Sequence, residues 1–529
     1  MKRNRYIGLV ALVLLLVCGG QIAASPMQQE VPLRFAEPVD GIVADLESFI
    51  PQYVREQNVP GVTITLIHDG RVAWTEGFGV ANTITGPPVT PDMAFEVASN
   101  SKVVTGYVAL RLVDQGLLSL DELLNAYLTE PWLPDSEYQD AITLRHVLSH
   151  TSGLGHGLTN RESLFPPGHG YSYSAGGFLY LQAVIEQITG KPLESVAQEL
   201  VFVPLGMSSS SFVVDAQRGT SGANGHVRAL VPLAVCAVLC LASTFICAPI
   251  GLLIVRIRTG RWRPPRGIAL GVFIVALTAS LVAAIVLGSA VLSGFGWLVG
   301  LVGLALAVAF ALAFLAGRVV IRWLGSHRKR LQVVAMTGWS VLVLIAVALG
   351  ASRVTNLPVP RPTRVEADAA GSLRATAGDM ATFLIELSAP QHLSPEMATQ
   401  LQTSQVKLSS DMAWGLGPGI QQSRQGDALW QWGQHLHSQS VMIIYPDHGF
   451  GVVVCTNNDL LNPDVAIEIA GRALGGKIEP IRRVSHLQFN YREGSQSKET
   501  GEVTSGTLFG GRSCSVSRMD TGGVAGCLT

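Results

Sequence analysis

Residues 96–108 read EVASNSKVVTGYV, where a polar stretch turns into an apolar helix and Ser99 stands three places before Lys102. Side chains three residues apart lie on the same face of a helix, so these two side chains can touch. The spacing alone is a weak signal, because it recurs elsewhere in the chain and because short polar residues also cap ordinary helices. The stretch therefore predicts either a helix cap or a nucleophile with its base, and the surrounding sequence must decide.

The composition indicates a membrane portion. Charged residues make up 14% of the 529 residues, against roughly 25% in a typical soluble protein, and the mean hydropathy is +0.35. The formal net charge of −1 gives no sign of nucleic-acid binding. The length is sufficient for more than one domain.

The middle of the chain predicts four transmembrane helices, since a span needs about 20 apolar residues. Five arginines lie in the connection 256–266 and five Arg or Lys residues in 318–330, whereas the turn near 293–296 carries no charge. Basic connections stay on the cytoplasmic side, so both ends of this block are expected to face outward. The predicted spans are 229–255, 267–292, 296–317 and 331–352.

Residues 1–25 have a basic start, an apolar core and a small-residue end, which predicts a secretory signal peptide. We therefore expect a multi-pass cell-membrane protein in contact with the lipid bilayer, with residues 26–226 and 353–478 outside the cytoplasm. The segment between them, 227–352, holds the four helices, and the Gly-, Ser- and Thr-rich residues 479–529 predict a disordered tail.

The two outer segments carry complementary parts of one fold. An amphipathic helix over 40–57 is followed by two strands that turn at 68–70. The second segment has two strands around a turn at 447–449 and a closing helix in PDVAIEIAGRALGG. Since two or three strands make a poor independent sheet, we expect both segments to share one antiparallel sheet, which requires an even number of spans between them.

Further helices are predicted between these strands. The apolar residues after Lys102 fit one helical face, and LSLDELLNAYL, ITLRHVLSHTSGL and FLYLQAVIEQITG add helical material. GSLRATAGDMATFLIEL predicts another helix at the start of the second outer segment.

These stretches resemble the serine β-lactamase/penicillin-binding protein superfamily, and most of all its β-lactamase-related branch near class C β-lactamases, D-Ala-D-Ala carboxypeptidases and esterases. The resemblance covers roughly residues 40–212 and 365–475. It implies an α/β (α+β) sandwich, with an antiparallel sheet and a helical lobe, here interrupted by the four-helix transmembrane region. The matching text, in the family's order, includes VPGVTITLIHDGRVAWTEGFGVAN, FEVASNSK, ITLRHVLSHTSGL, PPGHGYSYSAGGFLYLQAVIEQITGKPLE, SLRATAGDMATFLIEL and FGVVVCTNN.

The resemblance implies the roles of three residues. Ser99 would be the acyl-forming nucleophile, and Lys102 would be its base once burial makes a neutral amine available. The second motif of the family, Tyr-x-Asn, falls on residues 173–175, so Tyr173 would shuttle a proton. Ala175 stands where the family has asparagine, which puts the substrate type in doubt.

The third motif, Lys-Thr-Gly or His-x-Gly, is placed on Trp432, Gly433 and Gln434 by counting back from the strand SVMIIYP. The usual cation is then missing. The N–H of His435 would be the second oxyanion donor beside that of Ser99. His435 or His437 would be able to restore the positive charge, although a surface role for both is equally open.

These residues predict a membrane-embedded serine hydrolase that acts on a small-molecule or peptide substrate through an acyl-Ser99 intermediate. Cell-wall peptides, β-lactams and small esters are the expected substrates. No cofactor, metal or nucleic acid is expected. The alternatives are a sensor that is acylated and signals through the helices, and a catalytically silent binding domain. His150, in the sequence SHTSG, is expected to have a structural role.

Overall fold

The computed structural model describes residues 32–133, 136–138, 140–155, 163–215, 222–227, 356–359, 364–458, 464–476 and 481. The predicted signal peptide, the four predicted spans and nearly all of the predicted tail lie outside these residues, so they stay predictions. Among the helices that are described, none combines the length and the hydrophobicity needed to cross a bilayer.

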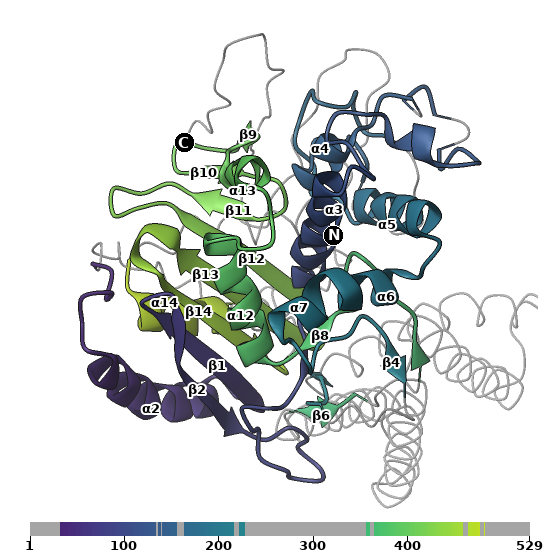
Figure 1. Ribbon diagram of the computed structural model, residues 1–529. Coiled ribbons are helices and arrows are strands. Elements are labelled where there is room, and N and C mark those ends of the chain that lie inside the picture. The colour runs from purple at the N-terminus through teal and green to yellow at the C-terminus, as the bar shows by residue number, and fades with distance from the viewer. Residues whose placement is uncertain are drawn as a thin grey trace, which may run out of the picture.

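An eight-stranded antiparallel sheet forms the centre of the protein, in the order β2-β1-β14-β13-β12-β11-β10-β9 (Figure 1). β1 pairs with β14 over six positions, so strands from the two segments that flank residues 227–352 are joined within the sheet. The antiparallel sheet and its two hairpins, predicted from the sequence, are confirmed. Its strands are β1 (Gly61–His68), β2 (Arg71–Gly79), β9 (Val406–Lys407), β10 (Met412–Trp414), β11 (Gly419–Gln421), β12 (Ala428–His435), β13 (Ser438–Tyr445) and β14 (Phe450–Thr456).

Helices cover both faces of the sheet because side chains alternate along each strand. In β14, Val452 and Val454 join the core beneath α2 (Val39–Glu56) and α14 (Val465–Leu474). Val453 and Cys455 join the opposite core, with α12 (Ala377–Ser388) and the helical lobe. Every residue of β14 is buried, as expected for a strand with a core on each side.

α2 forms because its apolar residues recur every four positions. Ile42, Leu46, Ile50 and Val54 are all buried on the face toward the sheet. The helix predicted over 40–57 is therefore confirmed, and it covers β1 and β2.

The helical lobe lies beside the sheet and begins with the helix that carries Lys102 (Figure 1). One predicted helix is shorter than expected: in LSLDELLNAYL only a short 3₁₀ turn, Leu124–Tyr127, forms. The remaining helices are α3 (Asn100–Asp114), α4 (Leu144–Leu148), α5 (Gly176–Thr189), α6 (Leu193–Ala197), the π-helical turn Gln198–Phe202, α7 (Val203–Leu205), α13 (Pro395–Gln402) and the 3₁₀ turn Pro446–His448.

Three short strand pairs also join the two segments that flank residues 227–352. β3 (Phe95–Glu96) pairs with β8 (Arg374–Ala375), so the start of GSLRATAGDMATFLIEL is a strand and its helix begins only at Ala377. The other two pairs lie at the ends of the intervening segment, where the chain leaves and returns side by side. They are β4 (Val214–Asp215) with β7 (Arg364–Val365) and β5 (His226–Val227) with β6 (Leu357–Pro358).

Candidate active site

The start of α3 brings the predicted nucleophile and base into contact. Ser99 is the N-cap residue, and Lys102 lies in the first turn of the helix. Lys102 Nζ is 3.1 Å from Ser99 Oγ and donates a 2.7 Å hydrogen bond to the carbonyl oxygen of Ala370. Ala98, directly before Ser99, has a positive φ of 47°, a conformation that is uncommon for residues with a Cβ and that often marks functional sites.

Burial prepares Lys102 to act as a base. Its side chain is 2% exposed, and this desolvation lowers the pKa of the ammonium group to about 7, against the opposing effect of the Asp368 carboxylate. A large fraction of the amine is therefore neutral near pH 7. A neutral amine can donate to Ala370 O and still accept the proton of Ser99, which is itself only partly buried.

Tyr173 completes the predicted group of three. Its hydroxyl is hydrogen-bonded to Ser99 and accepts a 3.1 Å hydrogen bond from Gln431 Nε2. Lys102 Nζ lies 4.9 Å from the centre of the tyrosine ring. Burial raises the pKa of the Tyr173 phenol to about 12, so the hydroxyl stays protonated at neutral pH and can relay a proton.

The loop that carries Tyr173 is held by His150. The His150 ring packs on the Tyr173 ring at 4.4 Å between centroids, and its Nδ1 accepts a hydrogen bond from the backbone N–H of Ser174. Its own φ of 57° turns the SHTSG segment back toward this loop. These contacts agree with the structural role expected for His150. Ala175 is the N-cap of α5 and offers no polar side chain, and the carbonyl of Ala370 bonds Lys102 instead.

β12 forms the wall opposite α3, and Gly433 is its point of closest approach. A Cβ at this position would lie 2.2 Å from Val97 O and 3.0 Å from Ser99 N. Glycine is therefore required if the strand is to reach the nucleophile. The placement of Gly433 beside Ser99 agrees with the sequence-based motif.

The first residue of the third motif is corrected by one position. Gln431, which precedes the predicted Trp432, donates to Tyr173 Oη and lies 3.4 Å from Ser99 O. Because side chains alternate along a strand, Trp432 points to the opposite face from Gln431. The motif therefore reads Gln431–Trp432–Gly433. Counting back from Gly433 by two, rather than from the end of the strand, would have found it.

The backbone direction also corrects the predicted oxyanion donor. β12 and β13 are joined by a two-residue turn, and His435 pairs with Ser438 at its base. Residues that flank such a turn exchange backbone hydrogen bonds, and the pattern then alternates. His435 and Gly433 therefore direct their N–H groups at β13, and Gln434 directs its own toward the open edge of β12. The amide of Gln434, and not that of His435, is the available donor.

A partly buried cluster of charges surrounds Glu96, a residue that the sequence analysis did not single out. Glu96 contacts Arg374 Nη1 at 3.2 Å, His435 Nδ1 at 3.1 Å and His437 Nδ1 at 3.4 Å. Hydrogen bonding to His435 and the charges of His437, Arg374 and His435 overcome burial and lower the pKa of the Glu96 carboxyl to about 2. Both histidines that were considered as replacement cations are thus turned toward Glu96. Its place in FEVASNSK was the only sequence signal for it.

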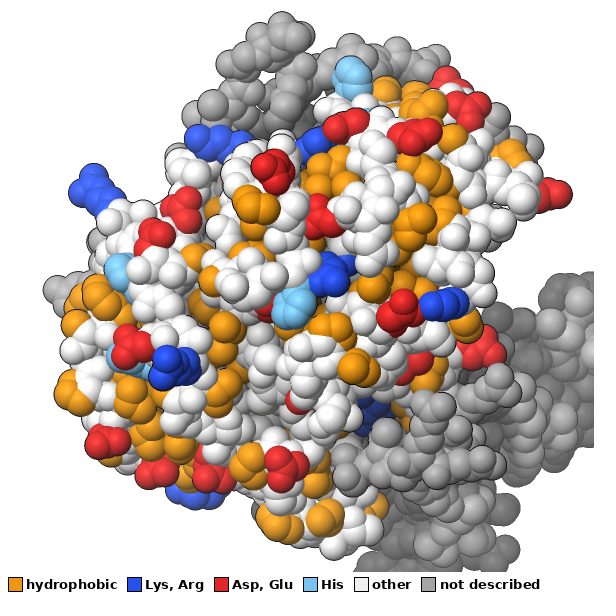
Figure 2. Space-filling model, viewed as in Figure 1, with side chains coloured by type: hydrophobic (Ala, Val, Ile, Leu, Met, Phe, Trp, Pro, Cys, Tyr) orange, Lys and Arg blue, Asp and Glu red, His pale blue; other side chains and the backbone are white. Residues whose placement is uncertain are grey.

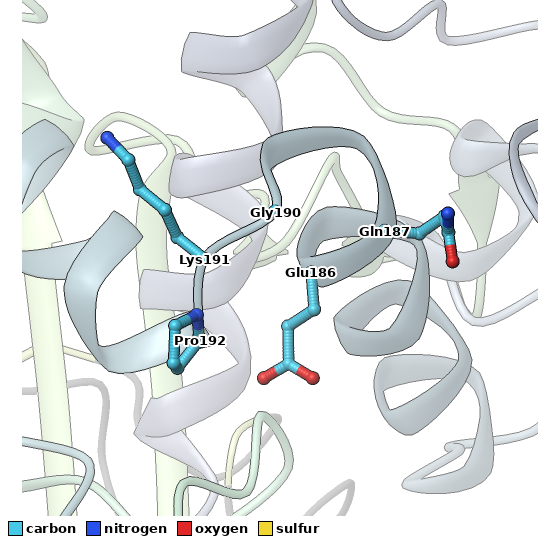
Figure 3. Close-up of a pocket in the computed structure, with 5 residues that line it drawn as sticks. All are labelled: Glu186, Gln187, Gly190, Lys191 and Pro192. Atoms are coloured by element: carbon cyan, nitrogen blue, oxygen red, sulfur yellow. The ribbon is translucent and has the colours of Figure 1, made fainter.

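The other features of the described residues give no competing site. Across the part of the chain that the structure describes, no group of His, Cys, Asp and Glu side chains is arranged to hold a metal ion. On the face in Figure 2, acidic and basic side chains are scattered rather than gathered into a patch of one sign. A shallow pocket of about 430 Å³ at the end of α5 contains none of the Ser99 group; it is lined by Glu186, Gln187, Gly190, Lys191 and Pro192 (Figure 3).

Comparison with known proteins supports the same assignment. The Beta-lactamase family model matches residues 46–236 and 336–477. Esterase EstB of Burkholderia gladioli is 30% identical over 215 residues, which cover 34% of this chain and 54% of the esterase. Penicillin-binding protein 4 of Amycolatopsis lactamdurans is 30% identical over 173 residues, covering 29% of this chain and 45% of that protein. The chain thus spans about half the length of these curated relatives.

Solved structures show the fold. The penicillin-binding protein homologue from Pyrococcus abyssi has a TM-score of 0.51 at 18% identity, covering 84% of this chain and 77% of that one. A class C beta-lactamase also has a TM-score of 0.51, at 13% identity, with 82% and 95% covered. Because the family model matches most of the chain and the Ser99 group is assembled around its motifs, this chain belongs to the beta-lactamase family of serine hydrolases.

Proposed function

We propose that this protein cleaves ester or amide bonds through an acyl-Ser99 intermediate. One observation carries the proposal: Ser99 Oγ lies within hydrogen-bonding distance of the buried Lys102 amine and is also hydrogen-bonded to Tyr173. A serine hydroxyl is a weak nucleophile at neutral pH, and an adjacent base is what activates it.

The reaction would begin with transfer of the Ser99 hydroxyl proton to the neutral amine of Lys102. Ser99 Oγ then bonds to the acyl carbon, and the carbonyl oxygen becomes an oxyanion. The backbone amides of Ser99 and Gln434 are the proposed donors to this oxygen. No hydrogen bond of the described backbone uses the Ser99 N–H as donor, which leaves it free for this role.

Release of the leaving group requires a proton. Tyr173 would pass a proton from the Lys102 ammonium to the leaving oxygen or nitrogen as its bond to the acyl carbon breaks. Water, activated by the same amine, would then attack the acyl group and regenerate Ser99. The names of the relatives support this range of chemistry, since they include an esterase, a penicillin-binding protein and, at the level of fold, a D-amino acid amidase.

We further propose that the hydrolase acts outside the cytoplasm, held in the cell membrane by the segment between its two parts. The support comes from the four apolar runs and their basic connections. The strand pairs β4–β7 and β5–β6 are compatible with this arrangement, because a segment with an even number of spans must leave and return on the same side.

A second candidate is a sensor that is acylated by a β-lactam or cell-wall fragment. One set of contacts favours it. Arg374 contacts both Glu96 and the carbonyl of Ala223, and the N–H of His226 bonds the carbonyl of His437. The residues just before the start of the intervening segment are thereby linked to β3, the strand that precedes Ser99.

The test uses the full chain purified in detergent. Steady hydrolysis of p-nitrophenyl esters, abolished in Ser99→Ala but retained in Ser208→Ala, would support the hydrolase. Ser208 lies in a turn of the helical lobe, outside the proposed machinery. Labelling of Ser99 by a fluorescent penicillin without turnover would favour the sensor. A folded protein with neither turnover nor labelling would exclude both and leave a silent binding domain.

A further inference from the structure

We propose that this site selects substrates whose leaving group carries no negative charge, which makes neutral esters its preferred class. The inference rests on the acyl-Ser99 chemistry proposed above. It follows from the charges that surround Ser99 and Tyr173, and from the neutral side chain that β12 places between them.

Gln431 lies where the leaving group would depart. Its Nε2 donates to the hydroxyl of Tyr173, which is the group positioned to protonate the leaving atom. The same nitrogen lies 3.4 Å from Ser99 O and 3.0 Å from Trp432 O. The carboxamide is thus a positioning group that holds Tyr173 without adding charge to this side of the site.

Among the described residues, the cations near the site are paired with an anion or lose their charge through burial. The guanidinium of Arg374 is paired with Glu96 and also donates to Ala223 O. His435 and His437 direct their rings at the same carboxylate, and burial lowers the pKa of His437 so that it is mainly neutral at pH 7. Lys102 is buried against Ala370 O, and it must lose its charge to act as base.

Negative charge is also close at hand. Asp368 acts electrostatically on Lys102 and accepts a hydrogen bond from the N–H of Ala370. Among the described residues, a carboxylate on the leaving group would find Arg374 already paired with Glu96, and it would approach the Asp368 carboxylate that acts on Lys102. Burying an unpaired charge is strongly unfavourable, whereas an ester or alcohol group incurs no such cost.

A matched pair of substrates tests this selectivity. Methyl 3-acetoxybenzoate and 3-acetoxybenzoate share an acetyl group and an aryl leaving group, and they differ in the leaving-group charge. For the full-length enzyme, kcat/KM for each is divided by its rate of hydrolysis by hydroxide. We expect the neutral ester to be favoured at least tenfold, with a smaller preference in 1 M NaCl, where charges are screened. Equal values, or preference for the anion, would overturn the inference.

The variant Gln431→Lys adds the missing cation, and Gln431→Met removes the hydrogen bonds without adding charge. We expect Gln431→Lys to reduce the preference at least tenfold and Gln431→Met to lower kcat for both esters while the preference remains. A Gln431→Lys preference equal to that of the wild type would refute the role of Gln431. If that variant does not fold, the wild-type ratio and its salt dependence still decide. A wild-type protein that neither hydrolysed these esters nor became labelled at Ser99 would instead refute the proposed function.

Discussion

The start of α3 and the end of β12 contribute the two sides of the same site, but they are specified in different ways. Ser99 and Lys102 meet because they lie one helical turn apart, and their contact needs only local structure. Gln431 reaches Ser99 across 332 residues of sequence, and its contact needs the whole register of the sheet. A shift of β12 by one residue would turn Trp432 toward the nucleophile in place of Gln431.

This difference explains where the sequence-based motif was right and where it failed. The helical pair was assigned from its spacing together with the family resemblance of the surrounding motifs, whereas the strand motif was misplaced by one position. Successive side chains of a strand point to opposite faces. An error of one residue in a strand motif therefore places every side chain on the wrong face. Substitutions on each side of the site can separate its dependence on local structure from its dependence on long-range structure.

A substitution of Lys102, on the α3 side of the site, should have the largest effect on catalysis. We expect Lys102→Ala to lower kcat/KM for a p-nitrophenyl ester by about 10²–10⁴, because Ser99 loses its general base. Lys191→Ala, which removes an exposed lysine paired with Glu199, serves as the control and should leave the rate unchanged. A Lys102→Ala enzyme with wild-type kcat/KM would show that Ser99 is activated by another group.

The β12 side of the site can be disturbed at Gly433, where the strand comes closest to Ser99. Gly433→Ala places a Cβ 2.2 Å from Val97 O, so β12 must move away from Ser99 and the Gln434 amide must leave the oxyanion position. We expect kcat to fall by about 10²–10³, and the free energy of unfolding to fall by about 1–3 kcal/mol.

The control for this change is Gly378→Ala in α12, where the added Cβ would meet only Thr376 Oγ1 at 3.8 Å. That variant should keep full activity and gain stability through helix propensity. Equal thermal unfolding temperatures and equal kcat for the two variants would contradict a close contact at Gly433.

Glu96 lies just before Ser99 and contacts His435 at the end of β12, so its removal should weaken the contact between the two sides of the site. Its folded-state pKa of about 2 lies below the ordinary value of 4.5, and the resulting stabilisation is about 3 kcal/mol. Because the folded pKa is depressed, this stabilisation is present above about pH 4.5 and is lost as the pH falls toward 2. Glu96→Gln should therefore destabilise the protein at pH 7 and have little effect near pH 2.

Denaturant unfolding at both pH values would measure this change. Asp121→Asn, which breaks the exposed pair with Arg145, is the control and should lose less than about 1 kcal/mol. A Glu96→Gln loss that did not shrink between pH 7 and pH 2 would mean that the carboxylate charge is not what holds the cluster.

The pH dependence of kcat/KM should show the smallest effect, and it reports on Lys102 in α3 alone. Only the neutral amine of Lys102 can accept the Ser99 proton, so kcat/KM should rise with pH through about 7 and fall about tenfold per unit below it. Gln431→Met should keep this midpoint, since Gln431 does not contact Lys102. An acidic midpoint near 5 would point to a carboxylate or histidine base instead.

Much of the fold was accessible from the sequence because its signals are periodic. The apolar residues of α2 and the strands around residues 68–70 and 447–449 were identified correctly. The short strands β9, β10 and β11 were not, because two- or three-residue strands carry no periodic signal and are defined by their neighbours. Ala370 could not have been predicted as the partner of Lys102, since it contributes only a backbone carbonyl.

The sequence by itself determined the Ser99–Lys102 pair, the position of Tyr173 in the second motif and the sharing of one sheet by two separate segments of the chain. These features depend on spacing along one helix or on the order of motifs. Only the tertiary structure decided that Gln431 hydrogen-bonds Tyr173 and that the Gln434 amide is the available oxyanion donor. It also decided that Glu96 contacts Arg374 and both histidines. The reason is physical: strand register and buried charge pairing arise from contacts between residues hundreds of positions apart.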